Sequence, residues 1–259
     1  MSDALRITCN HKEFLMNMTE LSNADVSIRV REFTLTVEGR SVPARVWSSN
    51  PGAGPAPLVL VGHGGSGHKA SQLVIDIAEP LVRHHGFVVA AIDGPVHGAR
   101  RAVFDDGVAV RQEFRDLWAT GQSINGMVND WLAVIDVLSN LPEVDAEAIG
   151  WYGISMGTAY GLPLVAANPK IKAAVLGMWG TSRVASERLV VDAADIHCPV
   201  LFQQKAADEF FTAQGQSELF DAIASPNKIH RLYPGLHTDP KDDQLRDIEA
   251  FLVQHLRHN

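Results

Sequence analysis

One serine stands between two glycines in the stretch Gly153-Ile-Ser-Met-Gly157. The apolar run AIGWYGI precedes Ser155, and the helix-compatible stretch MGTAYGLPLVAAN follows it. The pattern predicts a sharp turn from a strand into a helix, where side chains two residues from the serine would collide across the turn. Such a turn presents a hydroxyl at the end of a strand, so Ser155 is predicted to be a nucleophile.

A serine hydroxyl needs a base to take its proton, and the base needs a carboxylate that orients it. After a turn of this kind the acid and then the histidine are expected, each beyond a later strand. Asp208 follows the apolar run PVLFQQ and is the predicted acid, and His237 follows IHRLY and is the predicted base. Glu209 is the rival acid, and His230, inside the last expected strand, is the rival base.

Residues 61–69, VGHGGSGHK, follow another apolar run and precede a helical pattern. Glycines leave backbone N–H groups open to a bound oxygen, and the start of a helix adds a favourable dipole. The N–H groups of Gly65 and Met156 are therefore predicted to form an oxyanion hole, with Gly64 as the alternative to Gly65. A phosphate-binding loop is disfavoured, because neither G-x-G-x-x-G at a βαβ start nor a G-K-[ST] ending is present.

No metal and no cofactor are expected. The histidines at 63, 68, 84, 85 and 97 lack the spacing of an H-E-x-x-H site. His84 and His85 are adjacent, so on a helix they would point about 100° apart. Trp179 ends the strand-like run KAAVLGMWG and is predicted to wall a substrate pocket, which His97 is also predicted to line.

The predicted strands and helices that must hold these residues alternate along the chain. Residues 26–49 alternate apolar and polar side chains about Glu38-Gly39-Arg40 and predict an antiparallel hairpin. Later short apolar runs predict buried parallel strands. Helical patterns cover 70–86, where Pro80 is expected to bend or interrupt the helix, and 124–141 and 242–258. This order predicts an α/β fold with a mostly parallel, doubly wound sheet and helices on both faces.

Residues 26–259 are predicted to form a single domain, preceded by an N-terminal extension, residues 1–25, that has no obvious place in the sheet. Residues 97–122 are longer than an ordinary connection and are expected to cover the site. The aromatic residues of this excursion are Phe104, Phe114 and Trp118. Residues 181–198 leave room for a short helix at most, which favours a small or medium acyl group.

The composition excludes several classes of partner. A net charge of −8 and the absence of a long Lys/Arg run argue against nucleic acid and anionic membranes. Cys9 and Cys198 form no C-x-x-C pair and indicate reduced thiols. No signal-peptide pattern or membrane-length apolar run is present, so a cytoplasmic location is expected. The expected partner is a small-molecule ester, and a homo-oligomer is left open.

Five stretches together resemble the α/β-hydrolase superfamily, and most of all its small, lidless, dienelactone hydrolase-like branch. They are HGGSG (63–67), AIDGPVHGAR (91–100), NDWLAVIDVLSNLPEVDAEAIGWYGISMG (129–157), HCPVLFQQKAAD (197–208) and GLHTD (235–239). The resemblance implies an α/β-hydrolase fold with Ser155 as nucleophile, Asp208 as acid and His237 as base. Two departures are a serine where many members carry cysteine, and DGPVHG (93–98) in place of D-x-R-G-x-G. Asp93 is interpreted as structural.

The leading prediction is a serine hydrolase that cleaves carboxylic esters or lactones of small to medium acyl groups through an acyl-enzyme. One alternative is a lyase or C–C bond hydrolase that uses the same three residues. Another is a non-enzymatic ligand-binding protein on the same fold. A peptidase is disfavoured, because the chain has no room for the extra domain that excludes folded substrates.

Overall fold

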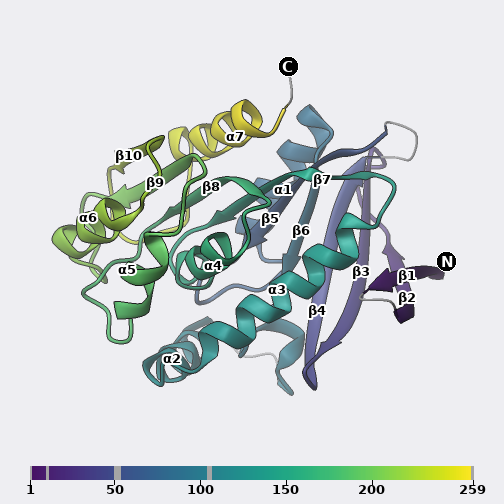
Figure 1. The fold of residues 1–259 in the computed structure, drawn as a ribbon, viewed down its shortest axis with the longest axis horizontal. Helices are drawn as coiled ribbons and strands as arrows, with labels where there is room; N and C mark the ends of the chain where they lie inside the picture. Colours follow the sequence, from purple (N-terminus) through teal and green to yellow (C-terminus); the bar gives the residue numbers. More distant parts are fainter. Residues whose placement is uncertain (1, 10–11, 50–53, 104–106, 258–259) are drawn as a thin grey trace.

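The structure, a computed structural model, describes residues 2–9, 12–49, 54–103 and 107–257, with side chains from Met18 onward. Within these residues ten strands form one sheet in the order β1-β2-β3-β4-β6-β5-β7-β8-β9-β10 (Figure 1). The strands are β1 Ser2–Cys9, β2 Lys12–Leu21, β3 Ile28–Val37, β4 Arg40–Ser49, β5 Ala56–Gly62, β6 Val88–Ile92, β7 Val144–Gly153, β8 Ile171–Gly177, β9 Val200–Lys205 and β10 Lys228–Tyr233. Strands β5 to β10 are parallel to one another, whereas β1 to β4 pair antiparallel and β4 joins them to β6.

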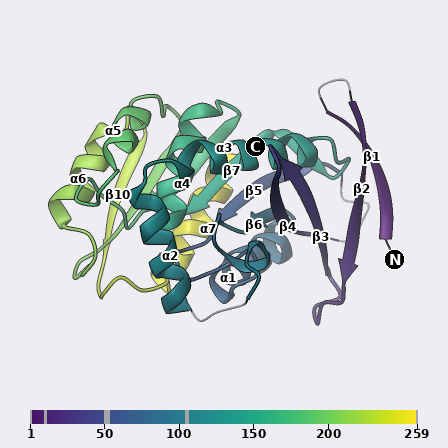
Figure 2. The same cartoon turned by 90° about the horizontal axis from the view of Figure 1, so that it is seen from below.

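Helices cover both faces of this sheet, as Figures 1 and 2 show. They are α1 Gln72–His85, α2 Gly107–Ala119, α3 Ser123–Ser139, α4 Met156–Ala167, α5 Glu187–Ala193, α6 Ala213–Ala222 and α7 Asp243–Leu256. Helices α1 and α7 pack against one face, and α3, α4 and α5 lie over the other. The predicted α/β fold, with a mostly parallel sheet covered on both faces, is therefore confirmed. None of the helices in the described residues is long and apolar enough to span a membrane.

Each face of the sheet has its own apolar core. Under α3 and α4 the rings of Trp131 and Trp151 meet edge to face, 5.1 Å apart, and both are fully buried. Under α1 and α7 most of the buried side chains are aliphatic, among them Ile77 and Leu252, with a few aromatic rings such as Phe87. Because both faces are covered, the central strands β5 and β6 are apolar throughout, as the short Val- and Ile-rich runs predict.

Helix α1 shows why its sequence forms a helix. Its apolar residues recur at helical spacing, and all of those that face the sheet are buried. Gly86 ends the helix in the left-handed conformation, with φ of 69°. The expected interruption at Pro80 does not occur, since the helix continues to His85. The carbonyl that loses its partner to this proline belongs to Asp76, which lies on the exposed side, where water can replace the bond.

The N-terminal residues extend the sheet. The predicted hairpin is formed by β3 and β4, which turn at Glu38 and Gly39 with positive φ angles. Strands β1 and β2 form a second hairpin, and β2 pairs antiparallel with β3 over Thr19–Leu21. The sequence analysis finds no obvious place in the sheet for residues 1–25, whereas the structure places Ser2–Cys9 and Lys12–Leu21 in it. Strand β2 pairs with the edge of β3, and the sequence pattern of β2 alone does not specify this partner.

The excursion at 97–122 contains a 3₁₀ turn, Gly98–Arg100, and helix α2. Phe114 and Trp118 of α2 are buried, and the Phe114 ring lies 6.0 Å from that of Tyr160 on α4 and 6.1 Å from that of Trp179 beyond β8. Helix α2 is thereby anchored close to the ends of the parallel strands. Phe104 lies outside the described residues.

Candidate active site

Ser155 stands at the turn between β7 and α4. Its backbone has φ of 55° and ψ of −122°, a combination that non-glycine residues rarely adopt. A Cβ on Gly157 would lie 2.6 Å from the Gly62 carbonyl oxygen, and a Cβ on Gly153 would lie 2.8 Å from the carbonyl oxygen of Gly157. The two glycines are thus required by close backbone approach, which is the reason that the sequence pattern suggests for them.

The structure brings Ser155, His237 and Asp208 together. His237 Nε2 lies 2.9 Å from Ser155 Oγ, and His237 Nδ1 lies 2.9 Å from Asp208 Oδ2. An ionised carboxylate only accepts hydrogen bonds, so Nδ1 carries the proton and donates it to Asp208. The unprotonated Nε2 therefore faces the serine hydroxyl, which is the arrangement that a general base requires.

Asp208 is held in place by more than the imidazole. Its Oδ1 accepts hydrogen bonds from the backbone N–H groups of Phe210 and Phe211 at 2.9 and 3.0 Å, and its side chain is only 2% exposed. Burial acts to raise the pKa of Asp208, but the hydrogen bond and charge of His237 and these two N–H groups outweigh it, and the pKa is lowered. Asp208 is thus kept ionised beside His237.

The two rivals of the sequence analysis have other contacts. Glu209 accepts a hydrogen bond from the backbone N–H of His237 at 2.8 Å, so it holds the loop and not the ring. His230 lies 2.8 Å from the side-chain oxygen of Gln204 and stacks on Phe220. Two adjacent carboxylates therefore hold His237, one through its imidazole and the other through its backbone.

The glycine loop after β5 supplies the expected backbone donors. Among the described residues, none accepts a hydrogen bond from the N–H groups of Gly64, Gly65 or Met156. Gly64 and Gly65 line the pocket beside Ser155, and Met156 opens helix α4, where the helix dipole favours negative charge. These free donors are available to a bound oxygen, so the oxyanion hole stays a prediction, with Gly64 as the alternative to Gly65.

Two buried histidines hold the carbonyl groups of the same loop. Gly94 N–H donates to His63 Nε2 at 2.9 Å, so the proton of His63 is on Nδ1, which donates to the Gly64 carbonyl at 2.8 Å. His97 Nε2 lies 3.1 Å from the Gly65 carbonyl and donates to it. Burial lowers the pKa of His63 to about 3 and that of His97 to about 4, so both are neutral at neutral pH.

The structure does not place His97 in the pocket wall, where the sequence analysis expects it. The side chain is fully buried behind Gly65, with its ring 4.9 Å from that of His63 and 6.1 Å from that of Phe114. The physical reason is its hydrogen bond to the Gly65 carbonyl, which turns the imidazole inward. His97 therefore positions the glycine loop.

Asp93 fixes the base of this loop. Its carboxylate is fully buried and accepts hydrogen bonds from the backbone N–H of Lys69 at 2.8 Å, from Lys69 Nζ at 3.0 Å and from the Ala99 N–H at 2.8 Å. Burial acts to raise the pKa of Asp93, but the contacts with Lys69 and Ala99 outweigh it and lower the pKa. Asp93 thus ties the loops after β5 and β6 together, in line with its structural interpretation.

Ser155 opens into a cavity of about 320 Å³. Trp179 lines it, at the position that the sequence analysis gives it, and is held by a hydrogen bond from its Nε1 to Ser186 Oγ at 3.1 Å. The Phe211 and Trp118 rings lie 4.7 and 5.0 Å from that of Trp179. The aromatic side of the cavity is therefore built by packed, mutually supporting rings.

Three arginines that the sequence analysis does not single out also line the cavity. They are Arg111 and Arg115 on α2 and Arg183 after β8. The guanidinium of Arg115 lies 5.2 Å from the Phe210 ring and that of Arg183 lies 5.1 Å from the Phe211 ring. In the described part of the chain, none of the three pairs with a carboxylate, and burial together with Arg115 lowers the pKa of Arg183. The described lining of the cavity thus carries three guanidinium groups and the carboxylate of Asp239, although the chain is acidic overall.

Comparison with known proteins gives a family and several similar structures. Residues 44–237 match the dienelactone hydrolase family. A cold-adapted esterase from an Arctic intertidal metagenomic library, in its PEG-bound complex, is 33% identical, with 94% of this chain and 100% of that chain covered and a TM-score of 0.83. No curated protein matches.

Two more distant structures share the fold. The acetyl xylan esterase from Paenibacillus sp. R4 is 17% identical, with 95% of this chain and 90% of that chain covered and a TM-score of 0.72. Acetyl xylan esterase 1 from Thermoanaerobacterium sp. JW/SL YS485 is 18% identical, with 92% and 87% covered and a TM-score of 0.71. At these identities the likeness concerns the fold alone.

The contact between Gly157 and Gly62 predicts that a methyl group added at Gly157 lowers the free energy of unfolding. Gly157→Ala forces α4 away from the loop after β5, and overpacking of this kind costs about 1–3 kcal/mol of unfolding free energy. Gly126→Ala in α3 is the matched control, because its Cβ meets nothing closer than 3.5 Å and alanine favours a helix. Urea unfolding of both variants measures the difference, and equal stability of Gly157→Ala and the parent chain would contradict the steric argument.

The buried histidines predict a pH dependence of stability. Their pKa values in the folded chain, about 3 and about 4, lie below the ordinary 6.5, so unfolding takes up protons below pH 6.5. The stability they confer is therefore complete above pH 6.5 and is lost as the pH falls toward 4, by on the order of 3 kcal/mol for His97.

His97→Gln tests this directly, because the glutamine amide can still donate to the Gly65 carbonyl but does not titrate. Urea midpoints at pH 6.5, 5.5 and 4.5 should fall less steeply for His97→Gln than for the parent chain. The exposed His197→Gln serves as control and should follow the parent. Parallel curves for all three proteins would show that His97 is not the titrating group.

Proposed function

The chain belongs to the dienelactone hydrolase family and is a carboxylesterase-like hydrolase, and on this basis we propose that it cleaves small carboxylic esters or lactones through a serine-bound acyl-enzyme. The observation that carries the proposal is the continuous relay from Ser155 Oγ through His237 to Asp208, with 2.9 Å at each step. The free backbone donors beside Ser155 support the same reaction.

In the first half of the proposed reaction, Ser155 Oγ attacks the carbonyl carbon while His237 Nε2 takes the hydroxyl proton. The carbonyl oxygen becomes negative and binds the N–H groups of Gly65 and Met156. Asp208 stabilises the imidazolium through Nδ1. The imidazolium then gives its proton to the alcohol oxygen as the ester C–O bond breaks, which leaves the acyl group on Oγ.

In the second half, a water molecule attacks the acyl carbon, and His237 Nε2 takes one of its protons. The oxyanion forms again on the same backbone donors. When the bond to Ser155 Oγ breaks, the imidazolium returns its proton to the serine and the carboxylic acid leaves. The strained turn at Ser155 supports both steps, because it holds Oγ beyond the carboxyl end of β7, beside the cavity and within reach of His237.

The cavity supports a small substrate with a negative charge. Its volume of about 320 Å³ suits a short acyl group, and the rings of Trp179 and Phe211 provide an apolar wall. The arginines of its lining have no carboxylate partner among the described residues, and they favour an ester or lactone that carries a carboxylate or similar anion, because guanidinium groups bind such groups with charge-assisted hydrogen bonds. The proposed partner is therefore a small, anionic ester, and the proposed location is the cytoplasm.

The roles of the two adjacent carboxylates predict different losses of activity. Asp208→Asn should lower kcat for p-nitrophenyl acetate by on the order of 10⁴, because His237 loses its orienting acceptor. Glu209→Gln should keep most of the activity, since its amide oxygen can still accept from the His237 N–H. A fluorophosphonate probe, followed by peptide mass spectrometry, should label Ser155 in the parent chain and leave Ser155→Ala unlabelled.

Three outcomes would contradict the proposed mechanism. Full labelling of Ser155→Ala would move the nucleophile elsewhere. The large loss in Glu209→Gln, with Asp208→Asn unaffected, would exchange the two carboxylates. Labelling at Ser155 without hydrolysis of any ester would favour a lyase or C–C bond hydrolase that uses the same residues.

The arginines predict a charge-selective effect. Arg115→Gln and Arg183→Gln should each lower kcat/KM for p-nitrophenyl hydrogen succinate about tenfold, the value of one charge-assisted hydrogen bond. The neutral p-nitrophenyl pentanoate, of similar length, should change little. Arg188→Gln, which removes an exposed arginine that pairs with Asp192 on α5, is the matched control. Equal losses on both substrates would mean that the arginines only support the packing of α2 and the loop after β8.

A further inference from the structure

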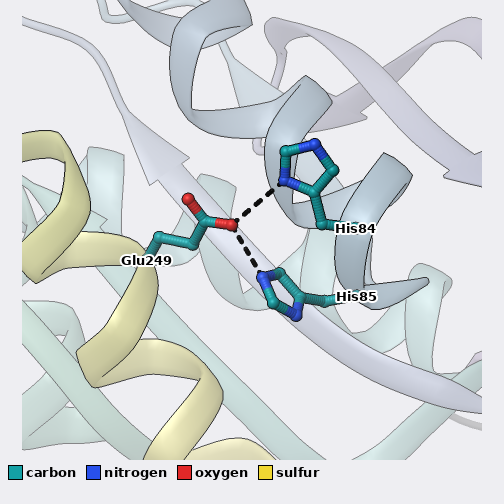
Figure 3. A group of neighbouring side chains, drawn as sticks. All are labelled: His84, His85 and Glu249. Carbon is teal, nitrogen blue, oxygen red and sulfur yellow. Dashed lines mark hydrogen bonds and ion pairs between the residues drawn. The ribbon is translucent and has the colours of Figure 1, made fainter.

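A second cluster of chemically capable side chains lies away from Ser155, between α1 and α7. His84 and His85 at the end of α1 and Glu249 on α7 point toward one another (Figure 3). His84 Nδ1 lies 3.3 Å and His85 Nε2 lies 2.7 Å from the same oxygen, Glu249 Oε1. One ligand atom from each residue lies within 4.8 Å of those of the other two.

The convergence of two adjacent histidines has a geometric explanation. Side chains of neighbouring helix residues diverge by about 100°, which is why the sequence argues against a shared ligand. His84 uses the ring nitrogen next to its backbone, Nδ1, whereas His85 uses the distal Nε2. The different reach of the two nitrogens compensates for the divergence, so both arrive at Glu249.

Two imidazoles and one carboxylate form a ligand set that zinc uses. Around a tetrahedral zinc with ligand bonds of about 2.0–2.1 Å, neighbouring ligand atoms are about 3.4 Å apart. The two separations from Glu249 Oε1, 2.7 and 3.3 Å, are close to this value, so small side-chain shifts would admit the ion. Magnesium and calcium prefer oxygen ligands and suit the cluster poorly.

We propose that His84, His85 and Glu249 bind one zinc ion, or a similar divalent transition metal, that joins α1 to α7. The side chains are 55%, 20% and 31% exposed, so an ion can enter from solvent and water can complete its coordination. His85 Nδ1 is buried without a described partner, which leaves Nε2 as the nitrogen that reaches the site.

The proposed ion acts on stability and not on the reaction. Helix α1 begins just after the glycine loop with Gly65, and α7 begins soon after His237, but the cluster lies at the far end of α1. Fourteen residues of helix at 1.5 Å each put it about 20 Å along the axis from Ser71. A metal there would tie together the two helices that follow the catalytic loops, without contact with the substrate.

The experiment uses the whole chain, freed of metal with a chelator and then titrated with zinc chloride. Calorimetry should find one high-affinity zinc ion per chain, and Tm should rise by about 5 °C at saturation, whereas magnesium chloride should have no effect. His84→Ala, His85→Ala and Glu249→Gln should each abolish most of the shift. His197→Ala removes an exposed histidine outside the cluster and should retain it.

The result can be read even if a variant is less stable, because the measured quantity is the change in Tm that zinc produces within each protein. Cobalt should add visible absorption bands to the parent chain and not to His85→Ala. The proposal is overturned if zinc leaves the Tm of the parent chain unchanged, or if the three variants keep the full shift.

Discussion

The active site depends on one close approach of two backbones, Gly157 of α4 against the Gly62 carbonyl at the end of β5. This contact leaves no room for a Cβ, and it fixes the start of α4 against the loop that follows β5. The Met156 N–H belongs to the start of α4, and the Gly65 N–H belongs to the loop after β5. The spacing of the two candidate oxyanion donors is therefore set by the backbone itself, before any side chain contributes.

Buried polar groups fix the loops that lie next to this backbone contact. His63 and His97 hold the carbonyls of Gly64 and Gly65, and Asp93 ties the same loop to the one after β6. Each makes at least one hydrogen bond, which offsets part of the cost of burying a polar group, although His97 Nδ1 has no partner among the described residues. Asp208 and Glu209 hold His237 by its ring and its backbone. The loops around the serine are thus fixed by short polar contacts.

The sequence predicts residues whose roles follow from position along one strand and its turn. Ser155, Asp208 and His237 each come at or just beyond the end of a strand, so their meeting follows from the parallel sheet. The sequence analysis expects His97 in the pocket wall, but the side chain is buried, because its orientation depends on the folded path of Gly65, thirty-two residues away. The arginines of α2 stand four apart, but that spacing gives only a shared helix face, and which face meets the cavity is decided by tertiary packing. The pairing of β2 with β3 likewise depends on tertiary contacts that the pattern of either strand does not specify.

Helix α2 meets two requirements, packing into the core and lining of the cavity, with different residues. Phe114 and Trp118 anchor it in the core, whereas Arg111 and Arg115 border the cavity. Substitutions at the two arginines leave the anchoring rings and the serine turn untouched. One helix thus assigns the lining of the cavity and the packing of the core to different residues, so the charge that faces the cavity can change while the rings that hold α2 in place stay as they are.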